Sequence, residues 1–89
     1  MTKQEKRLQK MRDNPKTVSY SDFVHVLEDF GYDIRMGKGS HRGAKLTIGE
    51  RGWRLTFVQP HGKRKFMHPE AVKDLLIQIT EIEDISSDE

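Results

Sequence analysis

The chain contains no cysteine, which excludes a disulfide framework, a zinc site built on thiolates and a cysteine nucleophile. A long apolar run is also absent, because the longest aliphatic stretch is residues 75–77, far short of the ~20 residues that span a bilayer. The basic N-terminus is not followed by the apolar segment of a secretory signal. We therefore expect a soluble, cytoplasmic protein without a membrane partner.

Large apolar residues are scarce over the chain as a whole. Leucine, isoleucine, valine and phenylalanine account for 21 of the 89 residues, and 18 of these 21 fall within residues 17–79. One small domain with a thin core is therefore expected. We predict a basic N-terminal extension at residues 1–16, a folded domain at residues 17–82, and an acidic C-terminal tail at residues 83–89 that frays.

Negative charge is nearly missing from residues 34–65. This stretch holds nine basic residues and the single acid Glu50, a net charge of +8. Residues 1–16 carry a net charge of +4, whereas residues 80–89 hold five acids and no base. A basic field of this density favours a polyanion as partner, because phosphate contacts release counterions. A solvated surface of lysines and arginines is the alternative.

Two helices are predicted from apolar residues at helical spacing. The first is capped by Ser19 or Ser21 and ends before Gly31, where a left-handed residue is favourable. The second begins at Pro69, with Met67 or His68 as an imperfect cap. The apolar stripes are Phe23, Val26, Leu27 and Phe30 in the first helix, and Val72, Leu75, Leu76, Ile79 and Ile82 in the second.

Three short segments with alternating apolar residues lie between the helices and predict β-strands. The expected inward residues are Tyr32, Ile34 and Met36, then Ala44, Leu46 and Ile48, then Trp53, Leu55 and Phe57. Glycine-bearing turns at residues 37–39 and 49–52 join the strands. The predicted fold is an α+β two-layer sandwich of order α-β-β-β-α, with a three-stranded antiparallel sheet whose second face is basic.

His41 is the candidate catalytic residue. Strand alternation places it on the basic face with Lys45 and Thr47, and histidine is well suited to accept a proton at neutral pH. It could remove the proton of an RNA 2′-hydroxyl while nearby cations stabilise the attacked phosphate. An incidental surface histidine is the alternative. The cations expected to bind RNA are Arg35, Lys38, Arg42, Lys45, Arg54 and Lys63.

No metal ion or other cofactor is expected. Magnesium sites need carboxylates close to the phosphate, and the basic stretch offers only Glu50. The four histidines lack the spacing of zinc ligands, and His25 is expected to be a solvated surface residue. His61 precedes three basic residues and is a candidate for protonating the leaving oxygen or binding phosphate, although a plain loop position fits equally well.

The residues Gly31-Tyr32, Arg35 and Lys38-Gly39-Ser40-His41 resemble a pattern of the HicA family of toxins from bacterial and archaeal toxin–antitoxin modules. In that family a Gly-Ser-His motif follows the first strand. The strand ending before Pro60-His61 and the closing aliphatic helix are similar to the rest of the pattern, so the resemblance covers about residues 18–82. The chain departs from many relatives at Arg42-Gly43, and in its basic extension and acidic tail.

This resemblance implies a fold like that of double-stranded-RNA-binding domains and metal-independent cleavage of mRNA, with His41 as the required histidine. It also implies RNA contacts at Gly39 and Ser40, and a HicB-like antitoxin that covers the basic face in a hetero-oligomeric complex. Two other functions stay open. One is a non-catalytic RNA-binding module in which His41 is dispensable, and the other is an assembly adaptor whose basic face docks an acidic protein.

Overall fold

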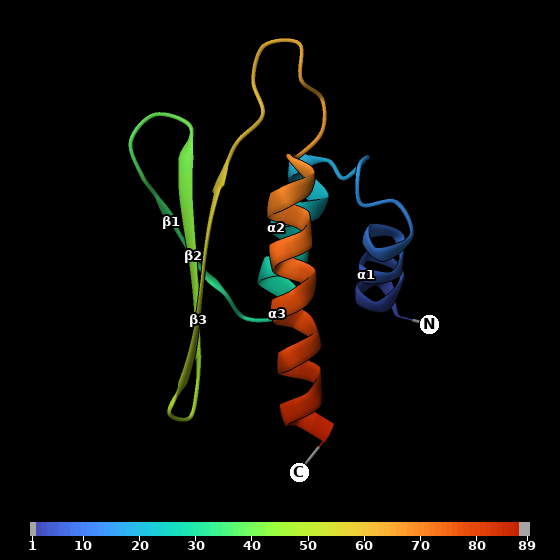
Figure 1. Cartoon of the computed structure of the whole chain (residues 1–89), viewed down its shortest axis with the longest axis vertical. Coiled ribbons are helices and arrows are strands. Elements are labelled where there is room, and N and C mark those ends of the chain that lie inside the picture. Colours follow the sequence, from blue (N-terminus) through green and yellow to red (C-terminus); the bar gives the residue numbers. More distant parts are fainter. Residues whose placement is uncertain (1, 88–89) are drawn as a thin grey trace.

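A computed structural model describes residues 2–87 of the chain, with the backbone alone described for residues 86 and 87. The elements are α1 (Lys3–Asp13), α2 (Tyr20–Asp29), β1 (Asp33–Met36), β2 (His41–Ile48), β3 (Arg51–Val58) and α3 (Pro69–Ser87). The predicted α+β sandwich and its α-β-β-β-α order are confirmed, with α1 as an additional helix before them. In Figure 1 the sheet forms one layer and α2 and α3 form the second. Helix α1 lies on the side of α2 and α3 that faces away from the sheet.

Local capping explains where α2 begins and ends. The Oγ of Ser19 accepts a hydrogen bond from the backbone N–H of Asp22 at 3.1 Å, so Ser19 and not Ser21 is the cap. At the other end, the N–H groups of Gly31 and Tyr32 donate to two carbonyls of the last helical turn, as in a Schellman motif. Gly31 has the left-handed φ of +86° that this motif needs, and the chain then enters β1.

The three strands form an antiparallel meander in the order β1-β2-β3. The inward residues buried as predicted are Tyr32, Ala44, Leu46, Trp53, Leu55 and Phe57. The predicted burial of Met36 is wrong: its side chain is 75 % exposed, because the four-residue strand β1 ends there at the edge of the sheet. Ile48 is 37 % exposed, since it ends β2 at the hairpin.

Helix α3 begins at Pro69, as predicted. The carbonyl of His68 accepts the first helical hydrogen bonds, which identifies His68 rather than Met67 as the preceding cap position. The residues of α3 that are buried in the core are Ala71, Val72, Leu75, Ile79 and Ile82. Residues 83–87, which belong to the predicted acidic tail, continue the helix, and Ile85 packs against the core. Residues 88 and 89 lie outside the described part of the chain.

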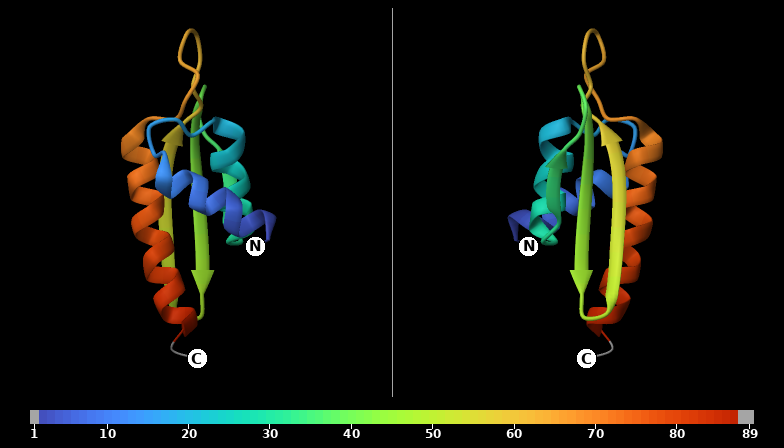
Figure 2. Two further views of the ribbon diagram at one scale, coloured as in Figure 1. Left: turned by 90° about the vertical axis from the view of Figure 1, so that its right-hand side faces the viewer. Right: turned by 90° about the vertical axis from the view of Figure 1, so that its left-hand side faces the viewer.

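Helix α1 is packed against the other helices. Leu8 and Met11 are buried in the same apolar cluster as the core of residues 17–82. The ion pairs that join α1 to α2 and α3 are Arg7–Asp29 at 2.6 Å, Lys10–Asp22 at 3.5 Å and Arg12–Glu83. Figure 2 shows α1 crossing the two helices on the side away from the sheet. The basic segment therefore covers the acidic surface of α2 and leaves the sheet open.

Candidate functional site

The sheet surface that faces away from the helices brings most of the predicted site residues together. No described helix covers this surface, as the right-hand view of Figure 2 shows. Alternate residues of a strand point to the same side, and the strand register aligns them across the sheet. The residues on this surface, called the outer face from here on, are Asp33, Arg35, His41, Gly43, Lys45, Thr47, Gly52, Arg54, Thr56 and Val58.

The turn between β1 and β2 holds His41 at one end of the outer face. The carbonyl of exposed Lys38 accepts a hydrogen bond from the N–H of His41 at 3.2 Å, and the His41 carbonyl accepts one from Gly37 at 2.9 Å. Gly39 has a φ of +63°, so this turn favours glycine there. The imidazole of His41 is exposed and makes no hydrogen bond within the described residues. It is therefore open to a substrate.

Three cations share the outer face with His41, and they differ in their ion pairing. The register places Lys45 between Asp33 of β1 and Arg54 of β3. Arg35 pairs with Asp33 at 2.9 Å, whereas Lys45 and Arg54 have no ion pair within residues 2–87. Asp33 lies just before the basic stretch of the sequence and offsets part of the charge predicted for this face. The unpaired cations are thus Lys45 and Arg54.

The backbone beneath Arg54 is held by α3. The Nε2 of Gln78 donates to the carbonyl of Arg54 at 2.7 Å, and the Oε1 of Gln78 accepts from the hydroxyl of Tyr32 at 2.7 Å. Burial, and secondarily the charge of Glu81, raises the pKa of Tyr32 from 10.0 to about 12, so its hydroxyl remains a donor further into the alkaline range. These bonds fix the edge strand to the helical layer. Sequence patterns gave no sign of them, because the partners are far apart in the chain.

Arg42 does not lie on the outer face, which corrects the prediction that it binds phosphate there. It points inward like Ala44 and is only 9 % exposed. Its guanidinium donates to the carbonyls of Gly39 and His41, both at 2.9 Å, and to Oε1 of Gln59 at 2.8 Å. Arg42 therefore ties the Gly-Ser-His turn to the segment after β3. Strand alternation in the sequence could have indicated this inward position, because the even-numbered residues of β2 face the helices.

The loop at residues 59–68 projects at the same end of the sheet as His41 (Figure 1). Its first residue is fixed to the Gly-Ser-His turn, since the N–H of Gln59 donates to the carbonyl of Ser40 at 2.9 Å. His61 and Lys63 are exposed in this loop, and no hydrogen bond among the described residues joins either side chain to His41. The loop adds positive charge at the same end of the sheet as His41.

The basic stretch at residues 34–65 is consequently divided among several environments. The outer face receives three of its cations, and the projecting loop holds Lys63 together with its two basic neighbours. Arg42 is buried, and Arg51 lies over the ring of the buried Trp53, 5.2 Å from its centroid. Lys38 is exposed in the turn beside His41, so Arg42 and Arg51 are the two cations of this stretch that lie away from the outer face, the turn and the loop.

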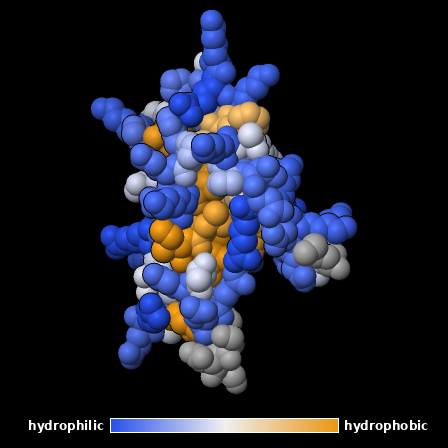
Figure 3. All heavy atoms as spheres, turned by 45° about the vertical axis from the view of Figure 1, so that its right-hand side comes forward, coloured by the Kyte–Doolittle hydropathy of each residue, from blue (hydrophilic) through white to orange (hydrophobic). Residues whose placement is uncertain are grey.

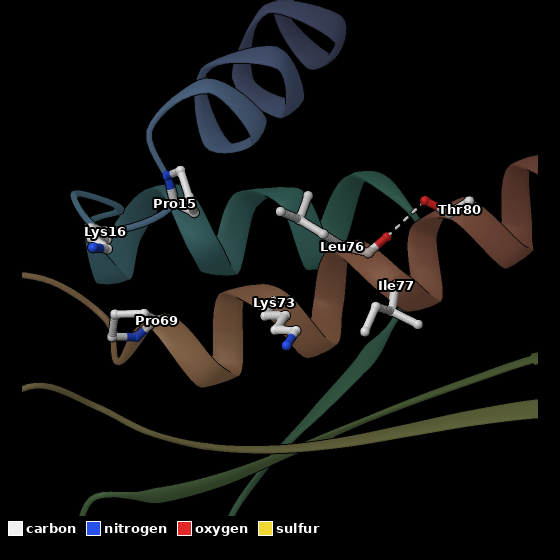
Figure 4. A pocket seen from close by; sticks show the side chains of 7 residues that line it. All are labelled: Pro15, Lys16, Pro69, Lys73, Leu76, Ile77 and Thr80. Atoms are coloured by element: carbon white, nitrogen blue, oxygen red, sulfur yellow. Dashed lines mark hydrogen bonds between the residues drawn. The ribbon is translucent and has the colours of Figure 1, made fainter.

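A cavity lies on the helical layer, away from His41. It is an apolar groove of about 400 Å³ between the α1–α2 connection and α3, shown from outside in Figure 3 and at close range in Figure 4. The residues that line it are Pro15, Lys16, Pro69, Lys73, Leu76, Ile77 and Thr80. Since the sheet and its outer face lie on the other side of α3, this groove is separate from the candidate site.

The described residues hold no metal centre, and the chain matches no known protein family. Within residues 2–87, no three histidine, aspartate or glutamate side chains gather as a metal site would require. None of the described helices is long and apolar enough to cross a bilayer. No protein-family model, curated protein or solved structure matches the chain. The resemblance to HicA toxins therefore rests on the sequence pattern around Gly39-Ser40-His41.

Proposed function

We propose that the chain is a metal-independent endoribonuclease of the HicA toxin type, with mRNA as substrate and His41 as general base. The observation that carries this proposal is an exposed imidazole at the end of a face on which Lys45 and Arg54 have no acidic partner among the described residues. Unpaired cations on an open surface suit a phosphate backbone. The resemblance supplies the toxin role.

The chemistry follows from the position of His41. Its imidazole removes the proton of an RNA 2′-hydroxyl, and the resulting oxygen attacks the adjacent phosphorus. The bond from phosphorus to the 5′-oxygen breaks, leaving a 2′,3′-cyclic phosphate and a free 5′-hydroxyl. Lys45 and Arg54 stabilise the charge that develops on the phosphate. The leaving oxygen takes its proton from His61 or from water.

An acidic antitoxin of the HicB type is the proposed protein partner. It would cover the outer face and block access to His41. Opposite charges steer association, so the association rate should fall as ionic strength rises. An association rate that is independent of salt would contradict this mode of inhibition.

The decisive experiment compares the wild type with His41→Gln on a long single-stranded RNA in EDTA. We expect cleavage by the wild type and a loss of roughly 10²–10⁴-fold in the variant, because a general base is removed. His25→Gln is the matched control, since His25 is also exposed but lies on α2, away from the outer face. Circular dichroism checks that both variants are folded. Undiminished cleavage by His41→Gln would overturn the proposal.

The substrate itself provides a second test of the mechanism. A 2′-deoxy substitution at the scissile nucleotide removes the proposed nucleophile, so it should abolish cleavage at that position. The products from unmodified RNA should carry a cyclic phosphate, which mass spectrometry detects. Equal cutting of DNA would rule out attack by a 2′-hydroxyl.

A non-catalytic RNA-binding module is the second candidate. It is favoured by one observation: no described side chain hydrogen-bonds to the imidazole of His41, whereas the base in many active sites is oriented by a third group. This candidate predicts salt-dependent RNA binding by both the wild type and His41→Gln, with no cleavage by either. The assay in EDTA therefore separates the two functions.

A further inference from the structure

Gly43 occupies an unusual position for a glycine. It lies within the central strand β2, where it is paired with Arg35 of β1 on one side and with Thr56 of β3 on the other. Glycine weakens the interior of a strand, because it loses much conformational freedom and contributes no side-chain packing. A glycine at this place therefore needs a reason.

The folded chain itself supplies no such reason. Gly43 is not among the glycines with positive φ, so its backbone conformation suits other residues. The pairing register runs through it without an extra residue, which excludes a β-bulge. A Cβ atom built on Gly43 would meet no heavy atom within 4 Å. Neither backbone strain nor a crowded neighbour thus explains the missing side chain.

The missing side chain opens a hollow on the outer face. The hollow has a volume of about 190 Å³, its exposed lining is almost wholly apolar, and it includes Arg35, Lys45, Arg54 and Thr56 around Gly43. This volume is below the several hundred Å³ of pockets that enclose a whole small ligand. It suits one unit of a longer molecule. Three cations surround an uncharged floor, which matches an apolar ring carried on a phosphate chain.

The distance to His41 points to the same kind of ligand. His41 and Gly43 lie two residues apart on one face of β2, which corresponds to roughly 7 Å along a strand. This spacing is comparable to the length of one nucleotide in an extended chain. An RNA chain with one 2′-hydroxyl at His41 would place a neighbouring nucleoside over Gly43.

We infer that the hollow over Gly43 is a binding site for one unstacked nucleoside of single-stranded RNA, next to the nucleotide at His41. The flanking phosphates contact Lys45 and Arg54, and the base lies flat where a side chain would otherwise stand. A duplex cannot supply such a base, because its bases are stacked and paired. The inference rests on the proposed RNA-directed function, and it names single-stranded RNA as the substrate class.

The test fills the hollow and leaves every charge in place. Gly43→Thr is compared with Gly52→Thr, which makes the same change on the same face. Gly52 pairs with Thr47 at the far end of the sheet. At Gly52 the nearest neighbour of a new Cβ is the Leu46 carbonyl at 3.7 Å, an ordinary contact. Both variants also carry His41→Gln, so that the RNA stays intact during the measurement.

Fluorescence anisotropy measures binding of a labelled single-stranded RNA of about twelve nucleotides, within the range of site sizes of single-strand binding domains. We expect Gly43→Thr to weaken binding about tenfold or more, as the loss of one base contact does. Gly52→Thr should leave the affinity unchanged, and binding of the same sequence as a duplex should not respond to Gly43→Thr. Because threonine favours strands, the melting temperature of Gly43→Thr should equal or exceed that of its parent.

Gly43→Ala adds a single carbon into open space and serves as the milder variant, with a smaller loss in the same direction. Equal single-strand affinities for Gly43→Thr and Gly52→Thr would overturn the nucleoside site, while cleavage dependent on His41 would stand independently. An equal loss of single-strand and duplex binding would also overturn it, since that pattern indicates a general phosphate contact. A parent protein that binds no RNA would refute the nucleoside site and the proposed function together.

Discussion

Two basic regions of the molecule are similar in the sequence and different in the structure. Of the five cations in α1, Arg7, Lys10 and Arg12 each pair with an acid of α2 or α3, whereas Lys3 and Lys6 have no ion pair within residues 2–87. On the outer face, Lys45 and Arg54 have no acidic partner within residues 2–87. Paired charges neutralise one another and join helices, whereas unpaired charges on an open surface remain available to a ligand. Segment charge alone would not have distinguished the cations that join helices from those of the proposed RNA-binding surface.

The largest expected effect comes from charge reversal on the outer face. Lys45→Glu with Arg54→Glu should lower RNA affinity by roughly 100-fold at low salt and reduce the slope of log K against log[salt] by about 2, one for each lost phosphate contact. The matched control is Lys10→Glu with Arg12→Glu, which makes the same charge change on α1. Anisotropy titrations at several salt concentrations provide both quantities. A comparable loss in the α1 control would break the distinction between the two regions.

The next effect concerns Arg42, which lies beneath the outer face and not on it. Arg42→Met should lower the free energy of unfolding by about 2–3 kcal/mol, because it removes the charged donor that serves three acceptors. Cleavage should fall as well, since the turn that carries His41 loses its anchor. Urea denaturation measures the first effect and the RNA assay the second. A variant with normal stability and weakened RNA binding would instead indicate that Arg42 contacts phosphate directly.

A smaller effect is expected within α1. The Arg7–Asp29 pair is partly buried and 2.6 Å long, whereas Lys10–Asp22 is more exposed and measures 3.5 Å. Arg7→Ala should therefore lower the free energy of unfolding by about 1 kcal/mol and Lys10→Ala by less than about 0.5 kcal/mol. Neither substitution should change RNA affinity. Denaturation at low and high salt measures the difference, and a larger effect for Lys10→Ala would contradict the geometry.

The smallest effect is alkaline destabilisation through Tyr32. Its pKa of about 12 in the folded chain exceeds the ordinary value of 10.0, so the folded state holds this proton more tightly than the unfolded state does. The resulting stability is fully present below pH 10 and is lost as the pH rises from about 10 to 12. Denaturation curves of the wild type and Tyr32→Phe across this interval should converge. A constant difference between them would exclude this linkage.

Local rules located most of the fold correctly. Ser19, one of the two predicted caps, Gly31 after the helix and Pro69 at the start of α3 each follow local rules for helix ends that involve only a few residues. The exposure of Met36 and the helical course of residues 83–87 escaped prediction, because each depends on what packs nearby. The burial of Leu8 and Met11 depends on the same kind of contact.

The candidate site was predictable in its outline. Alternation along β2 placed His41 and Lys45 on one face, and the structure has both of them there. The same alternation puts Arg42 inward, but a positive charge within a basic run suggested a surface ligand. Its burial is possible only because three acceptors from the turn and from Gln59 surround the guanidinium. Those acceptors come together only in the folded chain.

The sequence by itself determined the helices, the strands, the two faces of the sheet and the His41 turn, because periodicity and turn chemistry act over short distances. The tertiary structure decided that three cations of α1 have acidic partners in α2 or α3, whereas Lys45 and Arg54 on the outer face have none within residues 2–87. It also placed a hollow over Gly43, lined by cations of all three strands. The ion pairs and the hollow both depend on residues that are distant in the chain, so only the folded molecule determines them.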